Sequence, residues 1–121
     1  MPYPTVKPLQ TVRLYGNINT AANVNTTIAA PFQGRVLKVG ATVGGTAIAT
    51  APVTMTTDVN GTAMTGGVFN IATATTNASN SAFPSAGNIV NEDDSIGFQV
   101  TGGATGGGMI NIWADLRRGT I

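Results

Sequence analysis

One stretch of alternating residues, from Ala29 to Val43, most constrains how this chain can fold. After Gly34 an extended chain would present two faces, one with Arg35, Leu37, Val39, Ala41 and Val43, the other with Val36, Lys38, Gly40 and Thr42. Apart from Arg35 the first face is apolar, and a period of two over this length predicts a half-buried strand. Pro31 cannot donate a ladder hydrogen bond and Gly34 can adopt a tight reversal, so we expect one strand to end and another to begin here.

Other segments with a period of two predict strands over 10–16, 23–30, 53–59, 62–65, 68–72, 95–101 and 109–118. Asn60-Gly61 is the dipeptide that a type I′ hairpin turn prefers, while Gly66-Gly67 is expected to break a strand. We expect loops over 17–22 and 73–88, a turn over 91–94 and a glycine-rich connection over 102–108. About eight strands without a helical period predict an all-β antiparallel sandwich, a jelly roll first and an immunoglobulin-like sandwich second.

The length of 121 residues predicts a single β-sandwich domain over 10–121, preceded by an extended arm over 1–9. Proline at positions 2, 4 and 8 makes this arm too poor in hydrogen-bond donors for a central strand. Two interpretations remain open: a frayed terminus, or an arm that lies across a neighbouring subunit. The second would cover Tyr3 and Val6, which are otherwise apolar side chains without a partner.

Charged residues make up only 9% of the chain, and the net charge of +1 comes from six basic and five acidic residues scattered along it. This pattern predicts no electrostatic footprint for nucleic acid or for an anionic membrane. We find no leader sequence and no run of about 18 apolar residues, so we expect intracellular synthesis and no membrane partner. The absence of cysteine excludes disulfides.

The chain also contains no histidine, which removes the commonest general base and, together with cysteine, the usual ligands of transition metals. Five carboxylates remain, namely Asp58, Glu92, Asp93, Asp94 and Asp115. The run from Glu92 to Asp94 has the oxygen ligands of a calcium site but matches no established calcium loop, and we favour a polar turn. We therefore predict no catalytic residues, no metal, no cofactor and no enzymatic activity.

Interface candidates come from side chains that the alternation directs away from the core. In the segment 109–118 the inner face is Ile110, Ile112, Ala114 and Leu116, which places Trp113 outside as a candidate anchor, unless a loop or the arm of the same chain covers it. Arg117 and Arg118 are expected to pair with carboxylates of a partner. The complete set of candidates is Tyr3, Val6, Tyr15, Trp113, Arg117 and Arg118.

Three stretches together resemble a class of small head decoration proteins, or cement proteins, of tailed bacteriophages. They are APFQGRVLKVGATV at 30–43, VTMTTDVNGTAMTGGVFNIA at 53–72 and NIVNEDDSI at 88–96, the last followed by a glycine-rich turn and a final strand that ends in arginine. The resemblance extends over about residues 24–118 and consists of strands and turns without catalytic residues.

The resemblance implies a jelly-roll subunit that is made in the host cytoplasm and assembles as a homotrimer on the outer surface of the capsid. There it would contact the major capsid protein and stiffen the shell. The alternative is a receptor-binding or carbohydrate-binding jelly roll of a phage fibre or adhesin, for which Tyr3, Tyr15 and Trp113 would be the outward rings. An enzyme domain is disfavoured because reactive groups are missing.

Overall fold

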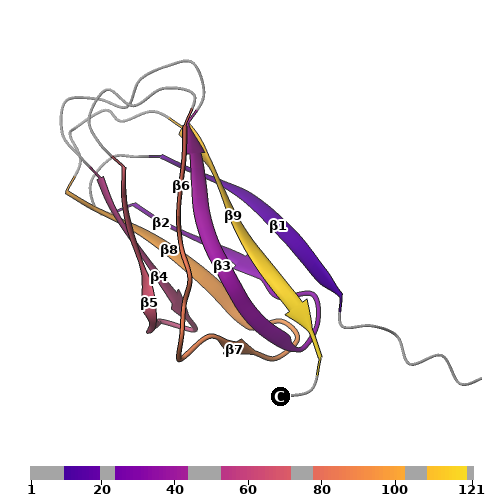
Figure 1. Cartoon of the computed structure of the whole chain (residues 1–121). Helices are drawn as coiled ribbons and strands as arrows, with labels where there is room; N and C mark the ends of the chain where they lie inside the picture. Colours follow the sequence, from indigo (N-terminus) through magenta and orange to yellow (C-terminus); the bar gives the residue numbers. More distant parts are fainter. Residues whose placement is uncertain (1–9, 20–23, 44–52, 72–77, 103–108, 120–121) are drawn as a thin grey trace, which may run out of the picture.

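The computed structural model describes residues 10–19, 24–43, 53–71, 78–102 and 109–119. Within these ranges the chain forms nine β-strands and no helix (Figure 1). The strands are β1 (Thr11–Asn19), β2 (Asn25–Ala29), β3 (Gly34–Val43), β4 (Val53–Val59), β5 (Thr62–Ile71), β6 (Ala78–Ala82), β7 (Ile89–Val90), β8 (Ser95–Gly102) and β9 (Met109–Arg118). The described part of the chain contains no helix that could cross a membrane.

The strands form two antiparallel sheets, which confirms the predicted all-β sandwich. One sheet has the order β1-β9-β3-β6, with β7 paired to β3, and the other has the order β2-β8-β4-β5. The two sheets lie against each other along most of their length (Figure 1), and the apolar side chains between them form one core. Its largest fully buried members are Phe98, Ile18, Met55, Ile71, Ile96, Ile112 and Leu116.

Several predicted elements are confirmed residue by residue. Strands β4 and β9 have the predicted bounds, and the predicted inner face of β9 is buried. Asn60 and Gly61 have φ angles of 51° and 87°, the two left-handed conformations that a type I′ turn requires. Residues 91–94 form the predicted turn before β8.

The predicted alternation along β3 is wrong at its start. Val36 is fully buried although the sequence pattern placed it outside, and Leu37 is only partly buried. The pairing of β3 with β9 shifts between Val36 and Lys38, so Leu37 is the extra residue of a β-bulge. The bulge lets Val36, Val39, Ala41 and Val43 all face the core, while Arg35, Lys38, Gly40 and Thr42 face outward.

Three other segments differ from the prediction by more than two residues. Strand β1 continues to Asn19 instead of ending at Gly16, because Ile18 is buried in the core. Gly66 takes a φ of 77° and lets β5 continue as one strand instead of two. The segment predicted as a loop over 73–88 contains β6, whose small residues ASNSA pair with β3. The arm over 1–9, with Tyr3 and Val6, and residues 103–108 of the glycine-rich connection lie outside the described residues.

Candidate interaction face

The outward side of the sheet β1-β9-β3-β6 brings together side chains that are far apart in the sequence. We call it the basic face. Strand register places Arg13 beside Asp115 and Asp115 beside Lys38, and it places Tyr15 beside Trp113 and Trp113 beside Gly40. At one end of the face Arg35 lies between Arg117 of β9 and Ile89 of β7. The cationic side chains of the face therefore lie at the end around Arg35 and Arg117 and in the next row, with Arg13 and Lys38, whereas exposed apolar side chains occur at both ends.

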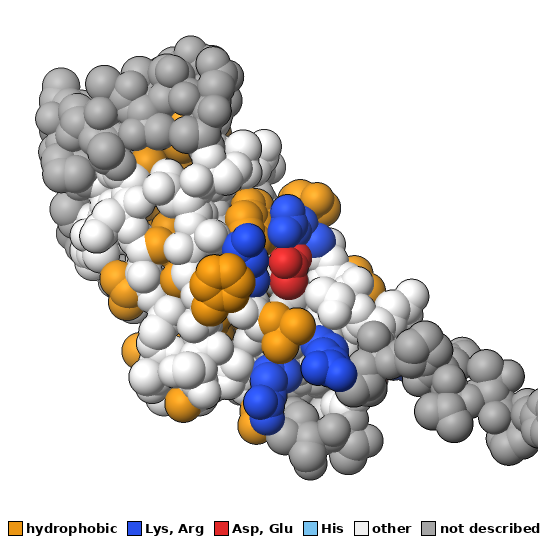
Figure 2. Space-filling view, viewed as in Figure 1, with side chains coloured by type: hydrophobic (Ala, Val, Ile, Leu, Met, Phe, Trp, Pro, Cys, Tyr) orange, Lys and Arg blue, Asp and Glu red, His pale blue; other side chains and the backbone are white. Residues whose placement is uncertain are grey.

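All five basic residues in the described part of the chain lie on or at the end of this face. Figure 2 shows blue side chains in two places, beside one red side chain and farther down the view. They are Arg13, Arg35, Lys38, Arg117 and Arg118. The basic residues are scattered along the sequence, but the strand order brings them together in the fold. Arg13 makes a bidentate contact with Asp115, at 2.7 and 3.0 Å, which raises the pKa of Arg13.

Large exposed apolar side chains are concentrated on the same face. Tyr15 is 69% exposed and Phe83 is 67% exposed, with the ammonium nitrogen of Lys38 lying 5.0 Å from the centre of the Phe83 ring. Ile89 and Met109 are also exposed there, whereas Val68, the fifth such residue of the described chain, belongs to β5 of the other sheet. Arginine, methionine and aromatic residues are the types enriched at the centres of protein interfaces.

Trp113 lies on the basic face, as the alternation predicted, but it is only 4% exposed. Its ring lies over Gly40, where a Cβ atom would fall 2.6 Å from the Cη2 atom of the indole. The guanidinium carbon of Arg13 lies 3.9 Å from the ring centre, and the indole N–H donates to Thr42 Oγ1 at 3.3 Å. Neighbouring strands of the same sheet therefore cover Trp113, so it is a packed residue of the face and not an exposed anchor.

The other predicted interface residues in the described chain, Tyr15, Arg117 and Arg118, are exposed on this surface, with the guanidinium carbon of Arg118 lying 5.1 Å from the centre of the Phe32 ring. Sequence reasoning missed Arg13, Arg35, Lys38, Phe83 and Met109 as members of the same surface. The outward positions of β1 and β9 were available from the alternation. The missing information was that β9 lies between β1 and β3, and that the bulge at Leu37 brings Arg35 to the same side of the sheet as Lys38.

The remaining four carboxylates lie at one end of the molecule, around the β4–β5 and β7–β8 turns. We call this region the acidic end, formed by Asp58, Glu92, Asp93 and Asp94. Asp94 Oδ2 accepts a hydrogen bond from the Asn91 N–H at 2.8 Å, and this bond, followed by the side chain of Asn60, holds the pKa of Asp94 below its ordinary value. Asp58 Oδ1 accepts from the Gly61 N–H at 3.1 Å. Both carboxylates therefore stabilise turns.

The lowered pKa of Asp94 predicts a pH-dependent stability. A carboxylate with a depressed pKa in the folded state stabilises the protein above its unfolded pKa of about 3.9, and this stabilisation is lost as the pH falls through the folded pKa. We expect Asp94→Asn to flatten the fall in unfolding midpoint that urea titrations of the wild type show at acidic pH. Identical profiles for wild type and Asp94→Asn would contradict the assignment.

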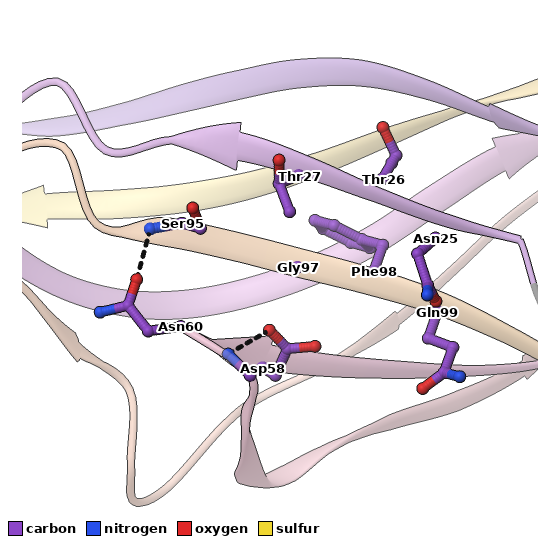
Figure 3. Close-up of a pocket in the computed structure, with 10 residues that line it drawn as sticks. Asn25, Thr26, Thr27, Asp58, Asn60, Ser95, Gly97, Phe98 and Gln99 are labelled. Atoms are coloured by element: carbon purple, nitrogen blue, oxygen red, sulfur yellow. Dashed lines mark hydrogen bonds between the residues drawn. The ribbon is translucent and has the colours of Figure 1, made fainter.

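A shallow polar groove of about 470 Å³ crosses the outer side of the other sheet (Figure 3). Asn25 and Thr27 of β2, Gly97 and Gln99 of β8, and Asp58 line it. The bare backbone at Gly97 leaves room for the Asp58 carboxylate beside it. The only aromatic lining residue, Phe98, is 1% exposed and turns into the core, so the groove lacks the exposed ring on which sugars usually stack.

No three acidic side chains within the described ranges gather as ligands for a metal ion, and the Glu92–Asp94 run forms the β7–β8 turn. No family model, curated protein or solved structure matches this chain. The basic face is the surface of the described chain with the strongest interface character.

Proposed function

We propose that this protein is a non-enzymatic capsid decoration protein, which binds the outside of a phage head and stabilises the lattice of the major capsid protein. The observation that carries the proposal is the basic face, where four exposed large apolar side chains and four cations share one side of one sheet, with a fifth cation, Arg118, at its end. A surface of this composition is suited to binding another protein. The described carboxylates support the same conclusion, since Asp58, Asp94 and Asp115 are engaged in turns or an ion pair.

The strand order also supports a jelly-roll subunit. The order is β1-β9-β3-β6 in one sheet and β2-β8-β4-β5 in the other. Apart from the β4–β5 hairpin, neighbouring strands come from distant parts of the chain. Such an order arises when a long antiparallel ribbon is wound into two Greek keys, which is the construction of jelly rolls in viral capsids.

The size of the basic face favours multivalent binding. From the rise per residue and the spacing between strands, the face is roughly 27 Å long along β9 and about 14 Å wide across the four strands, which gives an area of about 400 Å². This is about half of the 800 Å² or so that one partner contributes to an interface of standard size. A single contact of this kind would be weak, whereas several copies linked in one oligomer on a regular lattice would bind tightly through avidity.

The proposal is tested with heads assembled without this protein. Purified protein should bind to them at regular positions, visible by electron microscopy of the particles, and should raise the temperature at which the heads burst in calorimetry. Heads that already carry this protein at all of its binding positions serve as the control and should bind no more of it. Depleted heads that neither bind the protein nor become more heat-resistant would contradict the proposal.

The second candidate is a receptor-binding or carbohydrate-binding module of a fibre or adhesin. Its specific support is the pair of exposed rings, Tyr15 and Phe83, which lie near the cations Arg13 and Lys38 on one face. Rings beside cations suit a sugar that carries a carboxylate. A glycan array should then give signals that a Y15A/F83A variant loses, and an array without signals would remove this candidate.

A further inference from the structure

The β4–β5 turn contains a side-chain amide that is placed next to an unshielded backbone nitrogen. Asn60-Gly61 is the only asparagine–glycine pair in the sequence. Asn60 is exposed, and a Cβ atom added to Gly61 would meet nothing within 4 Å. Because glycine has no side chain to cover its nitrogen, that nitrogen can approach the preceding side-chain amide. In an unfolded chain, Asn60 is therefore the asparagine that is most easily deamidated.

Deamidation at this pair needs water as its only co-reactant. The Gly61 nitrogen attacks Cγ of Asn60, so that a new C–N bond forms and the Cγ–Nδ2 bond breaks. Nδ2 leaves as ammonia and takes the proton that the Gly61 nitrogen gives up. Water then opens the cyclic imide at either carbonyl, with its hydroxyl added to the carbon and its proton to the nitrogen. The product is aspartate or isoaspartate at position 60, and either one adds a negative charge to the turn.

In the folded protein, hydrogen bonds hold both reacting groups (Figure 3). The Gly61 N–H donates to Asp58 Oδ1 at 3.1 Å, and the Ser95 N–H donates to Asn60 Oδ1 at 2.9 Å. The Asn60 N–H donates to the Ser95 carbonyl at 2.8 Å. The backbone and the side chain of Asn60 are therefore both tied to the first residue of β8, and the nitrogen that would attack is tied to Asp58.

We infer that Asn60 is a deamidation site which the folded turn protects, and that Asp58 is the residue that protects it. Attack requires the Gly61 nitrogen to lose its proton, and the resulting negative charge would lie beside the Asp58 carboxylate, which disfavours it. Attack also requires Cγ of Asn60 to rotate towards that nitrogen and away from Ser95. The reaction therefore proceeds only in molecules whose turn has opened locally. This inference does not depend on the proposed function.

The two products should affect the hairpin differently. Aspartate at position 60 keeps an acceptor for the Ser95 N–H, whereas isoaspartate adds a methylene group to the backbone of a turn that fits two residues of ordinary length. The isoaspartate form should therefore lose its paired hydrogen bonds with Ser95. It should unfold at a lower urea concentration than Asn60→Asp, which has the aspartate product from the start.

Incubation of the folded protein, and of the same chain unfolded in urea, tests the protection. Both samples are kept at one mildly alkaline pH and one temperature, and peptide mass mapping locates each converted amide. In urea, position 60 should be converted before any other asparagine. In the folded protein its conversion should be at least about 10-fold slower, because local opening limits the reaction. Earlier conversion of another asparagine in urea, or equal rates at position 60 in both samples, would overturn the inference.

Asp58→Ala tests the role of the carboxylate, with Thr54→Ala as the matched control. Asp58→Ala removes the acceptor for the Gly61 N–H and should raise the folded-state rate about 10-fold, as expected for one hydrogen bond to a charged group. Thr54→Ala removes a bond of 2.9 Å to Asn70 from the same strand and should leave the rate unchanged. Asp58→Asn, which keeps a neutral acceptor, should give an intermediate rate.

Urea midpoints measured on the three variants show that each one folds. A folded-state rate that is unchanged in Asp58→Ala and Asp58→Asn would show that the carboxylate has no protective role. A rate that falls in both would show that the carboxylate removes the Gly61 proton and promotes the reaction. Either result would overturn the inference, and so would a rate that rises as much in Thr54→Ala as in Asp58→Ala.

Discussion

Trp113→Ala should lower the free energy of unfolding by about 3 kcal/mol, the lower end of the range for removing a large aromatic side chain. The indole is 4% exposed although it lies on the outer side of its sheet, and it fills the space above Gly40. Its removal leaves Arg13 without the ring 3.9 Å away and Thr42 without the indole donor. Urea denaturation followed by circular dichroism measures the change.

Tyr15→Ala is the matched control, because Tyr15 lies directly opposite Trp113 on the paired strand and is 69% exposed. This substitution should change the free energy of unfolding by less than about 0.5 kcal/mol, as exposed substitutions usually do. If Trp113→Ala were as mild as Tyr15→Ala, the indole would be an exposed interface residue after all, and the covering by Arg13 and Gly40 would be wrong.

Much of the fold was predictable because several strands that carry the core, β9 among them, alternate without interruption. In β9 every inner position is apolar and every residue from Met109 to Arg118 belongs to one strand, so the period alone fixes both bounds and faces. Asn60-Gly61 likewise fixes its turn, since few other dipeptides tolerate two left-handed residues in succession. In these places local conformational preference and burial favour the same structure.

The errors occur where tertiary packing overrides the local pattern. The β-bulge at Leu37 reverses the inner and outer faces of β3 at that point, and a strictly periodic interpretation must then misplace Val36. Strand β6 has no hydrophobic period, and it forms because the edge of β3 needs a partner for its backbone groups. Gly66 was expected to break a strand, but its positive φ angle of 77° is an irregularity within β5, which continues on both sides of it.

The candidate face was less predictable than the fold. Arg13, Lys38 and Arg117 are separated by long stretches of sequence, and only the order β1-β9-β3 makes them neighbours. A net charge of +1 suggests an even distribution, whereas the fold gathers the described cations around one face, where Asp115 is the carboxylate that pairs with Arg13. Alternation determines which side of a strand a residue occupies, but strand order determines which residues meet.

Gly34→Ala should be among the most destabilising single substitutions in the described chain, with a loss of about 3 kcal/mol. A Cβ at Gly34 would fall on the backbone carbonyl oxygen of Arg117 and lie 3.2 Å from Leu116 Cδ1. Since the carbonyl belongs to the paired strand β9, relief requires the two strands to move apart at the corner where β3 begins. Chemical denaturation should show a lower midpoint with an unchanged slope.

Gly97→Ala provides the matched control, because Gly97 also lies in a strand and its added Cβ also meets a close neighbour. That neighbour is the Asp58 carboxylate, the end of a side chain that can rotate away at the expense of its hydrogen bond from the Gly61 N–H. We expect a loss of about 1 kcal/mol for Gly97→Ala, the worth of one such bond. Equal losses of unfolding free energy for Gly34→Ala and Gly97→Ala would contradict the close packing of β3 on β9. In that packing the added Cβ at Gly34 meets backbone atoms of β9, which no side-chain rotation can move away.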